Sequence, residues 1–158
     1  MSEATLVRLL VFRVGNLACA AEVDAVREIL PRLPTTRIPG APPVVAGLVN
    51  VRGTLVTVVE GWRALGQAAP ADRGGGGGAV GSTVLLEVGG ARKLIGFTVD
   101  EVIDMLAVSE ATLEDRTGLA GVDPTLVRAV GRRDGQLFVV LDVTALLGPV
   151  LTTQGREQ

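Results

Sequence analysis

The chain contains no histidine and no tyrosine, and it has a single cysteine, Cys19. Histidine is the commonest general base and the commonest metal ligand in proteins, so its absence argues against a catalytic or metal centre. One cysteine excludes an intrachain disulfide and fits a reducing cytosol. We therefore expect a cytoplasmic protein that is not an enzyme and that uses no cofactor and no metal.

Long apolar runs and clustered charges are also missing. No stretch reaches the roughly 18 consecutive apolar residues that a membrane span needs, and the segment from Met1 to Leu10 has no basic part followed by a long apolar part. The net charge is −2, with the basic residues scattered along the chain. This pattern predicts neither direct membrane insertion nor nucleic acid as a partner.

The residues that are abundant favour an all-β protein. Hydrophobic residues make up 47% of the chain and aromatic ones only 3%, so valine, leucine, isoleucine and alanine must build the core. Side chains branched at Cβ suit pleated, half-buried strands. A chain of 158 residues is also long enough to bury a core without disulfides or metals.

Turn signals divide the chain into short hairpins. The expected strands are Leu6 to Val14, Leu17 to Ala21, Val44 to Val51, Leu55 to Val59, Thr83 to Val88, Lys93 to Val99, Leu126 to Arg132 and Gln136 to Val143.

Three other segments show weaker patterns. Val23, Val26 and Ile29 recur every three residues and predict a short helical turn, whereas Asp100 to Leu106 fits a helix or a strand. Thr144 to Leu147 predicts one helical turn that ends at Gly148-Pro149, followed by a frayed tail over 149–158.

A glycine-rich segment separates two sets of hairpins. Five consecutive glycines, Gly74 to Gly78, predict a flexible loop over 67–82. A phosphate-binding loop would need a Lys-Ser/Thr pair opening a helix, and none follows. We expect one domain over 5–148 with two small barrels, at about 16–66 and 83–143, and with the termini crossing over between them.

Several segments in order resemble one protein family. Val45 to Gly53 carries Gly47-x-x-Asn50-x-Arg52-Gly53, which resembles the Gly-x-x-Asn-x-Arg-Gly hallmark of CheW-like domains. Further similar segments occur in the family's order, and the resemblance runs from about Leu6 to Leu147; they are Gly15 to Ile29, Ile38-Pro39 with Pro42, Ile95 to Val102, and Leu141 to Leu147.

The resemblance implies a fold and a role. The family fold is two interlocked five-stranded Src-homology-3-like barrels that share a core, here with one or two short helices. Family members are adaptors that couple the cytoplasmic tips of methyl-accepting chemoreceptors to the regulatory domain of the histidine kinase CheA. The expected location is therefore the cytoplasm, at receptor arrays on the inner membrane. Weak self-association through the barrel ends is left open.

The same resemblance places a receptor-binding surface around the hallmark. Gly53 suits a turn with positive φ, and Asn50 can bind loop backbone through both ends of its amide. Arg52 offers a planar fork for a carboxylate, and Glu28 is the expected partner because it is the only acid in an apolar element. The alternative is that Arg52 only holds its own turn. The expected receptor-binding residues are Val26, Glu28, Gly47, Asn50, Arg52 and Gly53.

A kinase-binding surface is expected on neighbouring strands, because exposed apolar patches mark partner sites. The alternative for these residues is plain core, since alternation buries half of any strand. The candidates are Leu55, Val56, Thr57, Val58, Val84 and Leu85.

Other interpretations stay open at this stage. Thr57 and Glu60-Gly61 stand where the family usually has proline and Asp-Leu, so the chain could be a stand-alone CheW-like module in a motility or regulatory pathway. A single-strand nucleic-acid-binding barrel would need stacking aromatics, and the chain has few. The one acidic cluster, Asp100 with Glu101 and Asp104, is better explained as a solvated turn than as an enzyme site.

Overall fold

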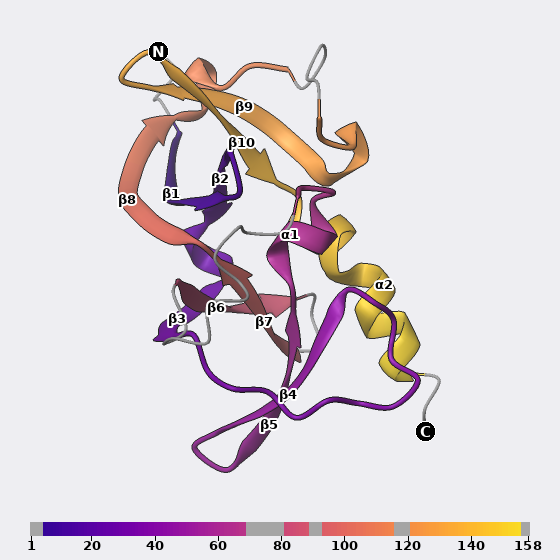
Figure 1. The fold of residues 1–158 in the computed structure, drawn as a ribbon. Coiled ribbons are helices and arrows are strands. Elements are labelled where there is room, and N and C mark those ends of the chain that lie inside the picture. Colours follow the sequence, from indigo (N-terminus) through magenta and orange to yellow (C-terminus); the bar gives the residue numbers. More distant parts are fainter. Residues whose placement is uncertain (1–4, 69–80, 89–92, 116–120, 156–158) are drawn as a thin grey trace.

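Two five-stranded sheets form the protein (Figure 1). The structure, a computed structural model, describes residues 5–68, 81–88, 93–115 and 121–155. Sheet A has the strand order β8-β1-β2-β10-β9, with bounds β1 (Leu6–Val14), β2 (Leu17–Glu22), β8 (Glu101–Ser109), β9 (Val127–Arg133) and β10 (Gln136–Leu141). Sheet B has the order β3-β6-β7-β5-β4, with bounds β3 (Val26–Pro31), β4 (Val45–Val51), β5 (Thr54–Val59), β6 (Ser82–Val88) and β7 (Lys93–Val99). The expected all-β class is confirmed.

The division into subdomains 16–66 and 83–143 is wrong. Sheet B takes its strands from both sides of the glycine-rich segment, since β6 pairs with β3 and β7 runs parallel to β5. Sheet A likewise joins β1 and β2 to β8, β9 and β10. The turn signals in the sequence indicate which consecutive strands form hairpins. They carry no signal for pairing between strands far apart in the chain, so the predicted subdomains followed the sequence order instead.

The two sheets repeat one arrangement. In each sheet a hairpin (β1–β2 or β6–β7) lies between a single strand (β8 or β3) and a second hairpin (β10–β9 or β5–β4). Strands β1–β5 and β6–β10 thus form two equivalent units, and each unit gives its first hairpin to one sheet and its other three strands to the other. The expected interlocking is confirmed in this form.

Backbone bridges join the two edges of each sheet. After β3 the chain returns to β4, where Thr36 and Leu48 exchange two N–H···O bonds of 2.8 Å. After β8 the chain reaches β9, where Glu114 and Val130 exchange bonds of 2.7 and 2.9 Å. These bridges curl each sheet around its own apolar interior.

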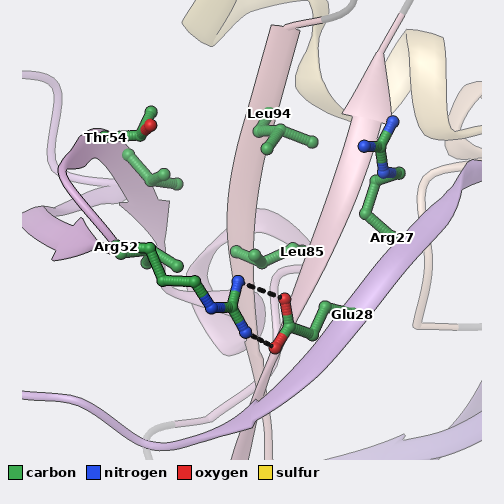
Figure 2. Close-up of a pocket in the computed structure, with 8 residues that line it drawn as sticks. Arg27, Glu28, Arg52, Thr54, Leu85 and Leu94 are labelled. Atoms are coloured by element: carbon green, nitrogen blue, oxygen red, sulfur yellow. Dashed lines mark hydrogen bonds and ion pairs between the residues drawn. The ribbon is translucent and has the colours of Figure 1, made fainter.

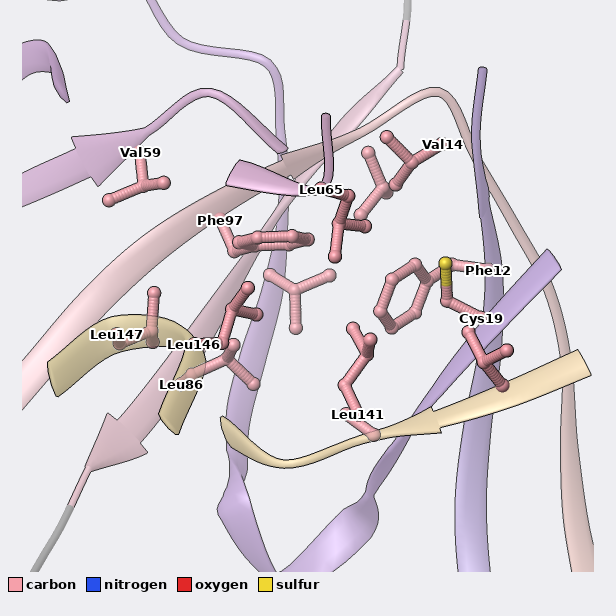
Figure 3. Packing of buried hydrophobic residues seen from close by; sticks show 14 of the residues in the cluster. Phe12, Val14, Cys19, Val59, Leu65, Leu86, Phe97, Leu141, Leu146 and Leu147 are labelled. Atoms are coloured by element: carbon pink, nitrogen blue, oxygen red, sulfur yellow. The ribbon is translucent and has the colours of Figure 1, made fainter. Parts of the chain in front are cut away.

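Three apolar clusters fill the molecule. One lies within sheet A around Leu9 and Phe138, and one lies within sheet B around Val56 and Leu85. The largest is shared by both sheets and contains Phe12 and Phe97, whose ring centroids are 6.1 Å apart (Figure 3). This shared core packs the two sheets against each other.

The helical predictions are corrected in part. Of the helical turn expected over Val23 to Ile29, the part Val23–Ala25 forms a 3-10 turn, whereas Val26–Pro31 is strand β3 because it pairs with β6. The segment that fitted either a helix or a strand is strand β8, which pairs with β1. A short helix, α1 (Gly61–Ala64), follows β5.

The C-terminal helix is longer than expected. Helix α2 (Val143–Gly155) continues through Pro149, so a single turn followed by a frayed tail from residue 149 is wrong up to Gly155. Leu146, Leu147 and Val150 are buried in the shared core, and this packing outweighs the unfavourable proline.

The boundaries of the expected loop over 67–82 also change. Gln67 donates hydrogen bonds to the Leu65 and Gly121 carbonyls, each at 3.1 Å, and Ser82 already belongs to β6. The five glycines themselves lie outside the described residues.

Candidate functional site

The hallmark residues form a tight turn at the end of the β4–β5 hairpin. Val51 and Thr54 face each other across the strands, so Arg52 and Gly53 form a two-residue loop. Their φ angles of +50° and +87° are those of a type I′ turn. The Asn50 side-chain oxygen accepts a hydrogen bond from the Gly53 N–H at 2.8 Å. The predicted positive φ at Gly53 is confirmed, and Arg52 adopts one as well.

Gly47 has a structural reason of its own. A Cβ at this position would overlap the carbonyl oxygen of Thr36, which bridges to Leu48. The strand also shifts register between Val45 and Gly47. Glycine is therefore required where the segment after β3 crosses close to β4.

Arg52 reaches across to the opposite edge of sheet B. Its Nη1 donates to Glu28 Oε1 at 2.9 Å and its Nη2 donates to Glu28 Oε2, which makes a bidentate ion pair with strand β3 (Figure 2). The predicted pairing is confirmed, and among the described contacts the guanidinium does not hold its own turn. The Arg52 side chain is 68% exposed and that of Glu28 31% exposed, so the pair lies at the surface.

The charges of this pair are secure at neutral pH. The hydrogen bond from Arg52, together with its positive charge, holds the pKa of Glu28 below its ordinary value. The same contacts raise the pKa of Arg52. The ion pair therefore persists until the pH falls below the usual glutamate range.

A cavity of about 270 Å³ opens beside the ion pair. Figure 2 shows Arg52 and Glu28 on one side of it, with Leu85 and Leu94 behind. The lining comes from all five strands of sheet B and the turn, and consists of Arg27, Glu28, Val51, Arg52, Thr54, Val56, Leu85 and Leu94. Of the expected receptor-binding residues, only Glu28 and Arg52 line it. Val26 is half-buried and packs against the shared core.

The expected kinase-binding residues do not form a surface patch. Five of the six are buried. Val56, Val58 and Leu85 lie in the interior of sheet B, Val84 lies in the shared core, and Thr57 is the fifth. The sixth, Leu55, is 65% exposed. The alternative of plain core therefore applies to all but Leu55. Neighbours such as Val84 and Leu85 point to opposite faces of the sheet, and both faces are covered by apolar clusters.

Sheet A holds a counterpart of the ion pair that the sequence did not reveal. Arg133, next to the Asp134-Gly135 turn, donates to Asp104 Oδ2 at 3.1 Å. Asp104 occupies the place in β8 that Glu28 has in β3, each just beyond a register shift. The turn was predicted, but nothing in the sequence links it to an acid 29 residues away.

The acidic cluster also has structural partners. Asp100 accepts a 2.6 Å hydrogen bond from the Gly15 N–H, and Glu101 pairs with Arg13 at 3.4 Å. Among the described residues, no group of three or more acidic or cysteine side chains could hold a metal ion. No helix in the described ranges is long and apolar enough to cross a membrane.

A family model named CheW-like domain matches residues 8–149. The chain belongs to the CheW-like domain family. It is similar to "Chemotaxis protein CheW" of Rhizobium meliloti, with 28% identity over 87% of this chain and 85% of that protein. It is also similar to the protein of the same name from Thermotoga maritima, with 23% identity over 93% of this chain and 91% of that protein.

A solved structure supports the same CheW-like fold. The scaffolding protein TtCheW from Thermoanaerobacter tengcongensis superposes with a TM-score of 0.79, covering 92% of this chain and 90% of that one. At 19% identity this likeness concerns the fold. Together, the family and its named relatives support a chemotaxis adaptor role.

Proposed function

We propose that this CheW-like protein is a non-catalytic adaptor that couples the cytoplasmic tips of methyl-accepting chemoreceptors to the histidine kinase CheA. It would act in the cytoplasm, within signalling arrays at the inner membrane. The family membership and the scaffolding name of its structural neighbour support this proposal. The observation that carries it is the exposed Arg52–Glu28 ion pair on a rigid turn, because it presents charged groups without a reaction centre.

The receptor surface is proposed around this ion pair, and includes Val26, Glu28, Gly47, Asn50, Arg52 and Gly53. Asn50 and Gly53 fix the turn, and Gly47 fixes the crossing below it, so their contribution is to hold Arg52 in place. The kinase surface is proposed to include Leu55, whose exposed side chain follows the same turn.

Substitution of Arg52 tests the receptor surface. Arg52→Ala should abolish binding to a purified receptor cytoplasmic fragment while the melting temperature stays close to wild type, because exposed ion pairs contribute little to stability. Arg52→Lys is the matched control: it keeps the charge but loses the bidentate fork, and binding should weaken without vanishing. If Arg52→Ala lowers binding and melting temperature together, the residue is structural only.

Reconstitution separates the adaptor from a stand-alone module of a motility or regulatory pathway. Addition of the protein to receptor and CheA should change the rate of kinase autophosphorylation. An unchanged rate, with binding intact, would favour the stand-alone alternative. The nucleic-acid alternative has little support, because Phe12, Phe97 and Phe138 are buried and the remaining aromatic residue, Trp62, is partly buried against the shared core.

A further inference from the structure

Half of the strand pairs join one five-strand unit, β1–β5, to the other, β6–β10. Within a unit, the paired strands of the described chain are hairpins, β1–β2 and β4–β5 in the first unit and β6–β7 and β9–β10 in the second. The pairs β1–β8, β2–β10, β3–β6 and β5–β7 all run between the units. Neither unit therefore forms a sheet of more than two strands by itself, and isolated hairpins are marginally stable in water.

The apolar clusters are divided between the units in the same way. In the shared core, Phe12 of the first unit lies against Phe97 of the second, with 6.1 Å between the ring centroids. The cluster inside sheet A joins Leu9 of the first unit to Phe138 of the second, and the cluster inside sheet B also takes residues from both. A unit alone would leave much of this apolar surface in water, so each unit is complete only when it has bound the other.

Ion pairs mark the boundary between the units. Arg27 on β3 donates to Glu87 on β6 at 2.8 Å, and Arg128 on β9 lies 3.2 Å from Glu22 at the end of β2. Such partly exposed pairs add little to stability. They favour this one alignment of the two units, because any other would separate the opposite charges.

The covalent link between the units takes no part in these contacts. It runs from β5 through α1 to β6, and it includes Gly74 to Gly78, which lie outside the described residues. Every contact named above can therefore be made equally well by a unit of another chain, as in domain swapping.

We propose that the partner that fits the surface between the units is the complementary unit of a second copy of this chain. Two chains then form an exchanged dimer, in which β1–β5 of each chain pairs with β6–β10 of the other. Both sheets and the shared core are rebuilt with the contacts of the monomer. The exchanged dimer displays each outer surface of the monomer twice.

Concentration decides between the monomer and the exchanged dimer. Two units joined by a short segment meet at an effective concentration on the order of millimolar, so dilute chains pair internally. Chains that fold together at about that concentration pair with each other as readily. Once folded, a dimer can return to monomers only when both sheets come apart, so the two forms can be separated by size.

Cysteine pairs distinguish exchange from any other kind of dimer. Arg8 on β1 and Ala107 on β8 are exposed and lie opposite each other between the units, whereas the exposed Arg132 and Leu137 lie opposite each other within the second unit. A chain with Arg8→Cys and a chain with Ala107→Cys, each also carrying Cys19→Ala, are refolded together at about 1 mM, and the dimer is isolated, diluted and oxidised. We expect a disulfide between the two chains. Chains with Arg132→Cys and Leu137→Cys, treated in the same way, should form none.

A control checks that each pair can form a disulfide. Both cysteines of a pair are placed in one chain, which is refolded at about 1 µM, where we expect a monomer with an internal disulfide. Leu6→Cys with Ser109→Cys, the pair at the end of the same two strands, replaces the first pair if its geometry fails this control.

Two results would overturn the proposal. If refolding at about 1 mM yields no dimer, or a dimer without the disulfide between β1 of one chain and β8 of the other, the units do not recognise each other across chains. If the pair within the second unit also links two chains, the dimer forms by surface contact and not by exchange. Receptor and kinase take no part in this measurement, so its outcome is independent of the adaptor function.

Discussion

Arg52 both forms part of the β4–β5 turn and pairs with Glu28 on strand β3. Its φ of +50° is a conformation that side chains other than glycine rarely adopt, yet it places the guanidinium across the sheet against Glu28. The pairing was predictable because Glu28 is the only acid in an apolar segment. Arg27 was not predictable as a cavity residue, because its role depends on a register shift between β3 and β6 that leaves no mark in the sequence.

Gly47 gives a prediction at the same scale. Gly47→Ala should destabilise the protein by about 1–3 kcal/mol, because the new methyl group overlaps the Thr36 carbonyl and breaks the bridge between the edges of sheet B. Denaturant unfolding measures the change. Gly53→Ala is the control: its φ is also positive but its surroundings are open, so it should cost about 1 kcal/mol. Equal stability of Gly47→Ala and wild type would contradict this account.

Among the secondary-structure elements, the sequence correctly predicted the hairpins, in which consecutive strands pair. The hairpins with Gly15-Asn16, Arg52-Gly53 and Asp134-Gly135 turns were predicted from those residues. Val26–Pro31 was misjudged because its strand conformation is imposed by β6, more than 50 residues away in the chain. Helix α2 was underestimated because burial of its apolar side chains, rather than intrinsic propensity, carries it past Pro149.

Helix α2 can be tested through Leu147, which is fully buried in the shared core. Leu147→Ala should lower the free energy of unfolding by about 2–5 kcal/mol, since it leaves a cavity among side chains of both sheets. Thr144→Ala, on the exposed side of the helix, should change it by less than about 0.5 kcal/mol. A similar small effect of both substitutions would show that the helix is only loosely attached.

For the whole molecule, the decisive feature is that the two five-strand units interlock. The parallel pairs β5–β7 and β2–β10 join distant parts of the chain, and hairpin signals cannot predict them. The family resemblance supplied the interlocking, whereas reasoning from the glycine-rich segment alone placed the boundary wrongly. The sequence could not reveal these pairings because they depend on apolar side chains of both sheets being buried together in the shared core.

The reactivity of the Cys19 thiol can be used to measure how well the shared core is closed. It is fully buried in the shared core, and burial raises the pKa of its thiol well above the ordinary value. A thiol reagent should therefore label the native protein roughly a thousandfold more slowly than the unfolded chain, at a rate set by opening of the core. Thr144→Cys provides an exposed thiol that should label at once. Rapid labelling of Cys19 in the folded protein would contradict the shared core.

In the sequence, the strands of sheet B (β3–β7) all lie between the first two and the last three strands of sheet A, and this order matters during synthesis. All strands of sheet B have left the ribosome once Val99 has emerged, whereas the hairpin made by β1 and β2 must wait for β10, which ends at Leu141. Until then, the shared core lacks Val139, Leu141, Leu146 and Leu147, so the face of sheet B that packs against them stays uncovered on the nascent chain. Translation speed through the last third of the message, or a chaperone holding that face, should therefore govern the yield of folded protein.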